Sequence, residues 1–207
     1  MVKNTIKSCL LMALLSVASL AIAAEGSLSK QASGTALGQR YTWYDGDQPR
    51  QVWVDPALVA EFAAGGNGSK TVRSLAPQAR DVTGKQRGIR LWQVETDPVQ
   101  TARSLGSSKA VGEFSPVLRD GSSTEARMRA LPGNVIVHLR PGIGEGEVQA
   151  WMQERQLRVL RKLDFAPNAY LIASEPGLES LELANSLRRH SEVSAAMPNW
   201  WVEVQAR

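Results

Sequence analysis

The first residues to consider are those that could take part in catalysis. The chain has two histidines, His138 and His190, among its 207 residues. A serine hydrolase needs a histidine that is oriented by a carboxylate and lies beside an activated serine. His138 is in the middle of an apolar run, and His190 follows two arginines where a helix is expected to end. Because neither is near a glycine-rich nucleophile turn, the sequence predicts that the protein is not an enzyme.

The only cysteine, Cys9, lies in an N-terminal segment that we expect to be removed. Two lysines precede an apolar run over residues 9–22, and Ala21-Ile22-Ala23 has the small-x-small pattern of a signal peptidase site. The run is shorter than the roughly 20 residues that cross a bilayer. We therefore expect a signal peptide over residues 1–24, cleaved near Ala23 and Ala24, and a periplasmic or secreted protein without stable membrane insertion.

The composition of the mature chain excludes several kinds of chemistry. Without Cys9 it has no disulfide, no catalytic thiol and no cysteine ligand for a metal. We expect no cofactor and no metal. The whole chain has 24 basic and 20 acidic residues, and the two kinds are interspersed. This pattern argues against a nucleic-acid partner, which needs basic residues massed together.

The first half of the mature chain predicts a small α+β module over residues 40–115. Residues 25–39 are small and polar and are expected to form a flexible lead-in. Strand-like runs at 41–44 and 51–54 flank Asp45-Gly46, a hairpin turn signal. A short helix, a strand and a second helix are expected after them, at residues 71–79, 89–95 and 98–105.

The second module, residues 116–200, has clearer periodicity. Strands are expected at residues 135–140, 157–163, 169–173 and 193–197, and helices at 144–156 and from Pro176-Gly177 onward. This order, β-α-β-β-α-β, is the ferredoxin-like one. If the first of these strands buries Val135, Val137 and Leu139 against the helices, Ile136 and His138 lie on the open face of the sheet.

A weak repeat relates the two modules. Four pairs of residues match at a constant offset of 82, namely Ala102, Leu105, Val111 and Pro116 with Ala184, Leu187, Val193 and Pro198. The repeat is expected either to be a true duplication or to be a coincidence of small and apolar residues. We predict an α+β fold of two tandem ferredoxin-like modules, with antiparallel sheets and helices on one face.

Several short motifs occur in an order that resembles the pro-domain of subtilisin-like serine proteases, particularly the fervidolysin-like kind. In the first half they are Tyr44-Asp45-Gly46, Val54-Asp55-Pro56-x-Leu58-Val59 and Ser115-Pro116-Val117-Leu118-Arg119-Asp120-Gly121. In the second half they are Gly133-x-Val135-Ile136-Val137, Arg140-Pro141-Gly142, Asn168-x-Tyr170-Leu171-Ile172, Leu183-Ala184-Asn185-x-Leu187 and Val193-x-x-Ala196-x-Pro198-Asn199. The catalytic motifs of the family are missing, and no protease follows. The resemblance therefore implies a stand-alone pro-domain that binds a protease.

By analogy with such pro-domains, the C-terminal tail is expected to lie in a protease cleft. The predicted binding residues are Trp200, Trp201, Val202, Glu203, Val204, Gln205, Ala206 and Arg207, with Ile136 and His138 on the open sheet face. Val204, Gln205 and Ala206 would fill successive subsites, and Arg207 would lie nearest the catalytic serine with a product-like carboxylate. One of the two tryptophans is expected to pack on the second module and the other to contact the partner. The C-terminal tail itself is expected to comprise residues 201–207.

The sequence thus predicts an exported protease inhibitor, and it leaves open a second role as a folding chaperone in trans. The resemblance implies a subtilisin-like serine protease as the partner. Two alternatives stay open at this point. The partner is an exported metalloprotease that reuses the same module, or the protein is a periplasmic adaptor that inhibits nothing.

Overall fold

The fold starts with a β-hairpin whose turn is set by Asp45-Gly46. The computed structural model of the chain describes residues 37–62, 68–108 and 112–204. Strand β1 (Arg40–Asp45) pairs antiparallel with β2 (Gln48–Phe62), and Asp45 lies opposite Gln48. Gly46 has a φ of 58°, in the left-handed region that a two-residue hairpin turn requires. The predicted hairpin is therefore present.

Strand β2 runs for 15 residues and changes its role at Asp55-Pro56. Its register against β5 (Glu113–Arg119) shifts between Val54 and Val59. The shift coincides with a proline, which has no N–H to offer a neighbouring strand. Up to this point β2 is mainly the second strand of the hairpin, and beyond it β2 is a central strand between β4 and β5.

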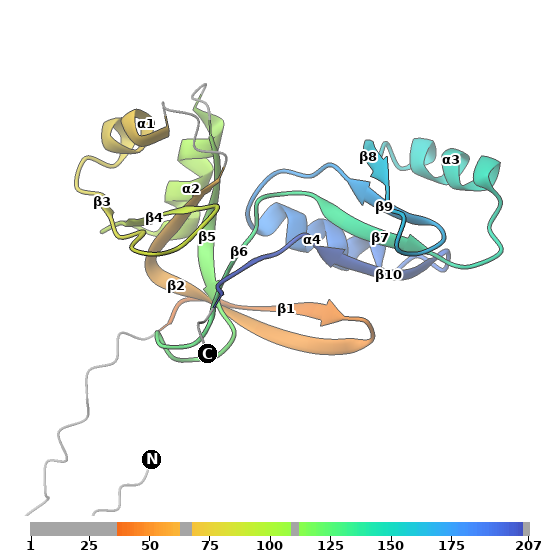
Figure 1. Ribbon diagram of the computed structural model, residues 1–207, viewed down its shortest axis with the longest axis horizontal. Coiled ribbons are helices and arrows are strands. Elements are labelled where there is room, and N and C mark those ends of the chain that lie inside the picture. The colour runs from red at the N-terminus through yellow and green to blue at the C-terminus, as the bar shows by residue number, and fades with distance from the viewer. Residues whose placement is uncertain (1–36, 63–67, 109–111, 205–207) are drawn as a thin grey trace, which may run out of the picture. The chain divides into compact units, whose positions relative to one another are not determined.

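The first sheet has seven strands in the described part of the chain, and all neighbours are antiparallel. The order is β11-β6-β5-β2-β4-β3, and β1 joins at β2 (Figure 1). The remaining strands are β3 (Arg80–Asp81), β4 (Arg90–Gln93), β6 (Met128–Ala130) and β11 (Trp201–Val202). Two helices, α1 (Gly68–Leu75) and α2 (Pro98–Ser107), pack on one face of this sheet. A second apolar cluster, built from strand and loop residues, covers the other face.

The second sheet has four strands in the order β10-β7-β9-β8, again with antiparallel neighbours. The strands are β7 (Val135–Leu139), β8 (Val159–Lys162), β9 (Ala169–Ile172) and β10 (Val193–Pro198). Helices α3 (Glu145–Glu154) and α4 (Leu178–Leu187) lie on one face. There Val148, Trp151 and Met152 of α3 pack with Ala184 and Leu187 of α4 on the strands. Two antiparallel sheets with four helices in the described residues confirm the α+β class.

The two halves of the chain follow the same path. Each half has strands and helices in the same order along the chain, β2-α1-β3-β4-α2-β5 in the first and β7-α3-β8-β9-α4-β10 in the second. The corresponding strands also lie in the same order within their sheets. Two pairs from the 82-residue repeat hold matching positions: Ala102 and Leu105 are buried on α2, as Ala184 and Leu187 are on α4. Pro116 and Pro198 lie in β5 and β10, whereas Val111 is outside the described residues.

Helix α4 takes part in both cores. Its Ala184 and Leu187 belong to the cluster of the second sheet. Its Leu178 and Leu181 belong to another cluster, in which they meet Trp43 and Leu118 of the first sheet. Because a helix turns once every 3.6 residues, one helix presents two such faces. The described residues accordingly belong to a single compact unit.

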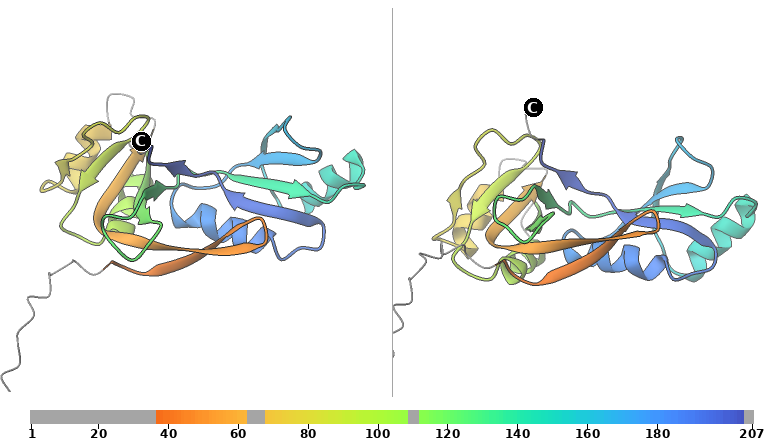
Figure 2. Two further views of the ribbon diagram at one scale, coloured as in Figure 1. Left: turned by 60° about the horizontal axis from the view of Figure 1, so that its bottom comes forward. Right: turned by 90° about the horizontal axis from the view of Figure 1, so that it is seen from below.

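The β1–β2 hairpin extends along α4 as an arm (Figure 2). The Asn185 side-chain amide donates to the Thr42 carbonyl at 2.8 Å. The Arg188 guanidinium donates to the Gly46 carbonyl and lies 3.1 Å from the Asp47 carboxylate. The same guanidinium stacks 4.2 Å from the centroid of the Tyr44 ring. The arm therefore ties the first sheet to the helix of the second.

Of the boundaries predicted from the sequence, one falls inside a strand and another coincides with the start of a strand. The expected division between residues 115 and 116 lies within β5. The expected tail, residues 201–207, begins with β11, which is an edge strand of the first sheet. The physical reason is the same in both cases, because a strand is completed by its partner strand and not by its own sequence.

Candidate functional site

The open face of the second sheet carries Ile136 and His138. Along β7, Val135, Val137 and Leu139 are buried, and Ile136 and His138 between them are half-buried. Alternate residues of a strand point to opposite faces. The three buried residues pack under α3 and α4, so Ile136 and His138 point away from the helices. The predicted facing of these five residues is confirmed.

The residues around Ile136 and His138 make this face largely apolar. In the register of the sheet, Ile136 lies beside Leu171 and Met197, and His138 lies beside Ala169 and Ala195. The ring of Phe165, from the loop between β8 and β9, lies 5.4 Å from the His138 ring and is 66% exposed. An exposed aromatic ring beside half-buried aliphatic side chains is typical of a surface that contacts another protein.

His190 lies elsewhere, on the side of the helices. Its ring meets Trp151 of α3 edge to face, with ring centroids 5.9 Å apart. Next to it, Glu192 has a pKa below its ordinary value, first because its own backbone N–H binds the carboxylate and then because of the Ser191 hydroxyl and the charge of Arg155. His138 and His190 are thus held by different neighbours. Among the described residues, no cluster of three or more histidine, cysteine or acidic side chains could hold a metal ion.

After β10 the chain leaves the second sheet at Trp200, and this residue packs on the first sheet. Its ring lies 5.4 Å from the Trp43 ring, at an interplanar angle of 65°. The Arg129 guanidinium stacks on both, 5.0 Å from the Trp43 ring and 5.5 Å from the Trp200 ring. Arg129 also pairs with Asp120. Cation–π contacts with two rings hold Trp200 in place.

Trp201 and Val202 form β11 at the edge of the first sheet. Trp201 pairs with Ala130 and Val202 with Arg129 of β6. The Trp201 indole N–H donates to the Arg87 carbonyl at 3.2 Å. Sequence reasoning expected one of the two tryptophans to pack on the protein and the other to contact a partner. In the structure both contact the first sheet of their own chain.

Glu203 is held by four hydrogen bonds. Its backbone N–H donates to the Met128 carbonyl at 3.0 Å, and its own carbonyl accepts from Arg127 at 3.0 Å. Its carboxylate accepts from the Gln86 side-chain amide at 2.8 Å and from the Met128 N–H at 3.1 Å. These bonds connect the C-terminal segment to two loops and a strand of the first sheet. The local sequence does not predict these hydrogen bonds, because their partners lie at least 75 residues away along the chain.

The part of the predicted tail that is free for a partner begins at Val204. Val204 is 86% exposed, the largest exposure among the large hydrophobic residues of the described chain. Gln205, Ala206 and Arg207 lie outside the described residues. Of the eight predicted tail residues, Trp200 to Glu203 therefore belong to the fold of the first sheet. Whether the others enter a protease cleft stays a prediction.

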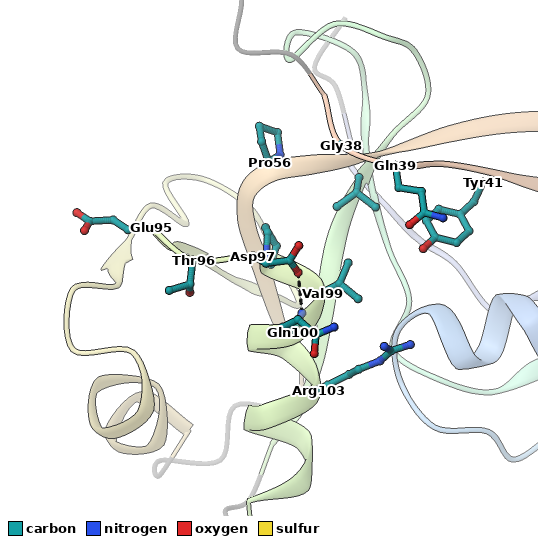
Figure 3. A pocket seen from close by; sticks show the side chains of 12 residues that line it. Gly38, Gln39, Tyr41, Pro56, Glu95, Thr96, Asp97, Val99, Gln100 and Arg103 are labelled. Carbon is teal, nitrogen blue, oxygen red and sulfur yellow. Dashed lines mark hydrogen bonds between the residues drawn. The ribbon is translucent and has the colours of Figure 1, made fainter.

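A pocket of about 430 Å³ lies between the start of β1 and the N-terminal end of α2 (Figure 3). In its wall, the Asp97 carboxylate caps α2 by accepting the Gln100 N–H at 2.8 Å. Burial, followed by the charge of Glu182, raises the pKa of Tyr41 at the pocket's edge. The described lining residues include no histidine, cysteine or serine. The described lining thus contains no serine–histidine or cysteine–histidine pair, and its ionisable side chains are Tyr41, Glu95, Asp97 and Arg103.

Comparison with known proteins gives no relative: no protein-family model, no curated protein and no solved structure matches this chain. Within residues 37–62, 68–108 and 112–204, no helix is long and apolar enough to cross a membrane. The candidate site consists of the open face of the second sheet and the anchored C-terminal segment.

Proposed function

We propose that the protein is exported, binds a protease in its active-site cleft and inhibits it, without a catalytic activity of its own. The observation that carries this proposal is the state of the C-terminal segment. It is tied to the first sheet through Glu203 and then presents Val204, which is 86% exposed. An inhibitory segment that is already held at one end loses less conformational freedom on binding than a free tail does.

The fold proposed for the two halves is ferredoxin-like in each case. The support is that each half has the order β-α-β-β-α-β, and that the spatial orders β5-β2-β4-β3 and β10-β7-β9-β8 correspond strand by strand. Strands β1, β6 and β11 are additions to the first half. We propose that the two halves arose by duplication, and the motifs that carry the resemblance to subtilase pro-domains occur in both of them.

The proposed mode of binding is an extended one. Protease clefts take their substrates as strands, through backbone hydrogen bonds and side-chain pockets. Val204, Gln205 and Ala206 fill successive subsites on the non-primed side, and Arg207 lies nearest the catalytic serine. A target that accepts arginine at this position is therefore favoured.

Four residues do not make a specific interface by themselves. Such an interface covers on the order of 800 Å² on each partner. The open face of the second sheet, with Ile136, His138 and Phe165, is the proposed source of additional area. Its half-buried aliphatic residues and exposed phenylalanine suit the apolar centre of an interface.

The test is inhibition of purified exported proteases by the mature chain, starting at residue 25. A subtilisin-like serine protease is the expected target. Deleting Val204–Arg207 should raise the inhibition constant at least about tenfold, which corresponds to about 1.4 kcal/mol. The melting temperature should stay the same, because Glu203 and its hydrogen bonds remain.

The other outcomes separate the alternatives. Inhibition of a metalloprotease alone would keep the inhibitor role and change the class of target. An inhibition constant unchanged by the deletion would contradict the cleft mechanism. Failure to inhibit any exported protease would contradict the proposed function and favour an adaptor.

A further inference from the structure

The anchoring of Glu203 limits where a partner can be. The four residues proposed to enter the cleft, Val204 to Arg207, span at most about 14 Å when fully extended. They start from a residue whose backbone and side chain are both bonded to the first sheet. A cleft that receives them must therefore lie directly against this edge of the first sheet. The groups at this edge then become part of the interface.

Two loops of the first sheet surround the exit point of the segment. The loop between β3 and β4 contributes Gln86, which binds the Glu203 carboxylate at 2.8 Å, and the Arg87 carbonyl, which accepts from Trp201 at 3.2 Å. The loop between β5 and β6 contributes Arg127, which donates to the Glu203 carbonyl at 3.0 Å. In Figure 2 the β3–β4 loop lies beside the C-terminal strand. The side chains of Lys85, Arg87 and Arg127 are exposed there.

Three basic side chains are exposed around the exit point, those of Lys85 and Arg87 on one loop and Arg127 on the other. Arg90, which follows the first loop, is paired with Glu61 and Asp81. Two carboxylates lie beside these three cations: the exposed Glu125 of the second loop, and Glu203, whose carboxylate is bound by the uncharged Gln86 amide and Met128 N–H.

We infer that Lys85, Arg87 and Arg127 form a second contact surface, which meets an acidic surface beside the cleft of the partner protease. This inference rests on the proposed function. It assigns the first module a direct part in recognition, beyond carrying the tail. Charges around an interface mainly accelerate association and select the partner, so the effect is expected in the association rate.

The test is a charge reversal that leaves the anchor intact. Lys85→Glu with Arg87→Glu changes two exposed side chains that form no ion pair within the described residues. The matched control is Arg158→Glu with Arg189→Glu, which makes the same charge change at exposed positions of the second module. Association rates are taken from progress curves of the purified subtilisin-like protease that the wild-type chain inhibits best, at low and high salt.

The expected result is an association rate at least about tenfold lower for the Lys85/Arg87 variant at low ionic strength, and a small difference at high salt. The control pair should change the rate by less than about threefold. An equal loss of association rate in both variants, or no loss in either, would contradict the basic contact surface. In that case inhibition by the wild-type chain would still support the proposed function. If the wild-type chain inhibits no protease, the proposed function fails and this inference falls with it.

Discussion

Asp55 and Arg119 show how single residues hold the first sheet together. Both are almost fully buried, with exposed fractions of 3% and 9%. The guanidinium contacts the carboxylate through two nitrogens at 2.8 Å, and Arg119 also donates to the Ala126 carbonyl at 2.9 Å. The other Asp55 oxygen accepts the Ala57 N–H. The pair therefore connects the irregular point of β2 to β5 and to the loop that follows it.

Removing one member of this pair should destabilise the protein strongly. We expect Asp55→Ala to lower the free energy of unfolding by about 3–5 kcal/mol, because it leaves a buried guanidinium without its partner. The measurement is urea denaturation. The control is Glu154→Ala, which breaks an exposed pair with Arg155 and should cost less than about 1 kcal/mol. A loss below about 1 kcal/mol for Asp55→Ala would contradict the role of the pair.

Glu113 gives a pH-dependent prediction at the same scale. Glu113 is the exposed first residue of β5, and partial desolvation by its surroundings raises its pKa above the ordinary value of 4.5, with the nearby Glu175 carboxylate raising it further. A raised pKa in the folded state means that the ionised carboxylate destabilises the fold at neutral pH. Glu113→Gln should therefore increase stability at pH 7. The gain should disappear as the pH falls below 4.5, because wild-type Glu113 is then neutral as well.

Chemical denaturation at neutral and acidic pH measures this difference. Glu125→Gln, on an exposed loop residue, is the matched control and should leave the stability unchanged at both values. Equal stability of Glu113→Gln and the wild type at pH 7 would contradict the destabilising role of Glu113.

At the scale of elements, a few polar contacts add to the apolar cluster of Trp43 and Leu181 in holding the hairpin arm on α4. Asn185→Ala removes the bond to the Thr42 carbonyl, and Arg188→Ala removes the contacts to Gly46, Asp47 and Tyr44. Each substitution should lower the free energy of unfolding by about 1 kcal/mol. Amide hydrogen exchange should accelerate in β1.

The control for the arm is Arg189→Ala, next in the chain and exposed. It should change neither the stability nor the exchange in β1. If Arg188→Ala and Arg189→Ala had the same effect, the contacts between arm and helix would not contribute.

At the scale of the whole molecule, α4 couples the two sheets. Leu181 belongs to the core that contains Trp43 and Leu118, and Leu187 belongs to the core of the second sheet. Because one helix completes both cores, neither sheet keeps its packing when the other unfolds. We therefore expect a single unfolding transition for the described residues.

Two probes can check this. In a Trp151→Phe variant, the fluorescence arises from the five tryptophans outside the second core, and far-ultraviolet circular dichroism reports both sheets. The two transitions should coincide. Leu181→Ala should shift both together and cost about 2–5 kcal/mol. Separate transitions would show that the halves are independent.

Much of this fold can be predicted from the sequence because its signals are local. Alternation along residues 135–139 predicts which side of β7 is buried, and Asp45-Gly46 predicts the hairpin. Both follow from the geometry of single elements, in which each residue's direction depends on its near neighbours. The open face with Ile136 and His138 is therefore predictable without a structure.

The position of the C-terminal segment is decided only by the tertiary structure. β11 pairs with β6, which lies some 70 residues earlier, and Glu203 binds Gln86, 117 residues away. The motifs around Asp55 and Arg119 likewise meet across 64 residues. Hydrogen bonds between distant strands and loops produce no periodic pattern in the sequence of either segment. Each backbone or side-chain group is paired with a partner that its own segment does not specify. The sequence by itself determined the hairpin, the elements of the second half and the buried face of β7. The tertiary structure decided the short strands β3, β6 and β11, and it decided that the expected free tail is held to the first sheet as far as Glu203.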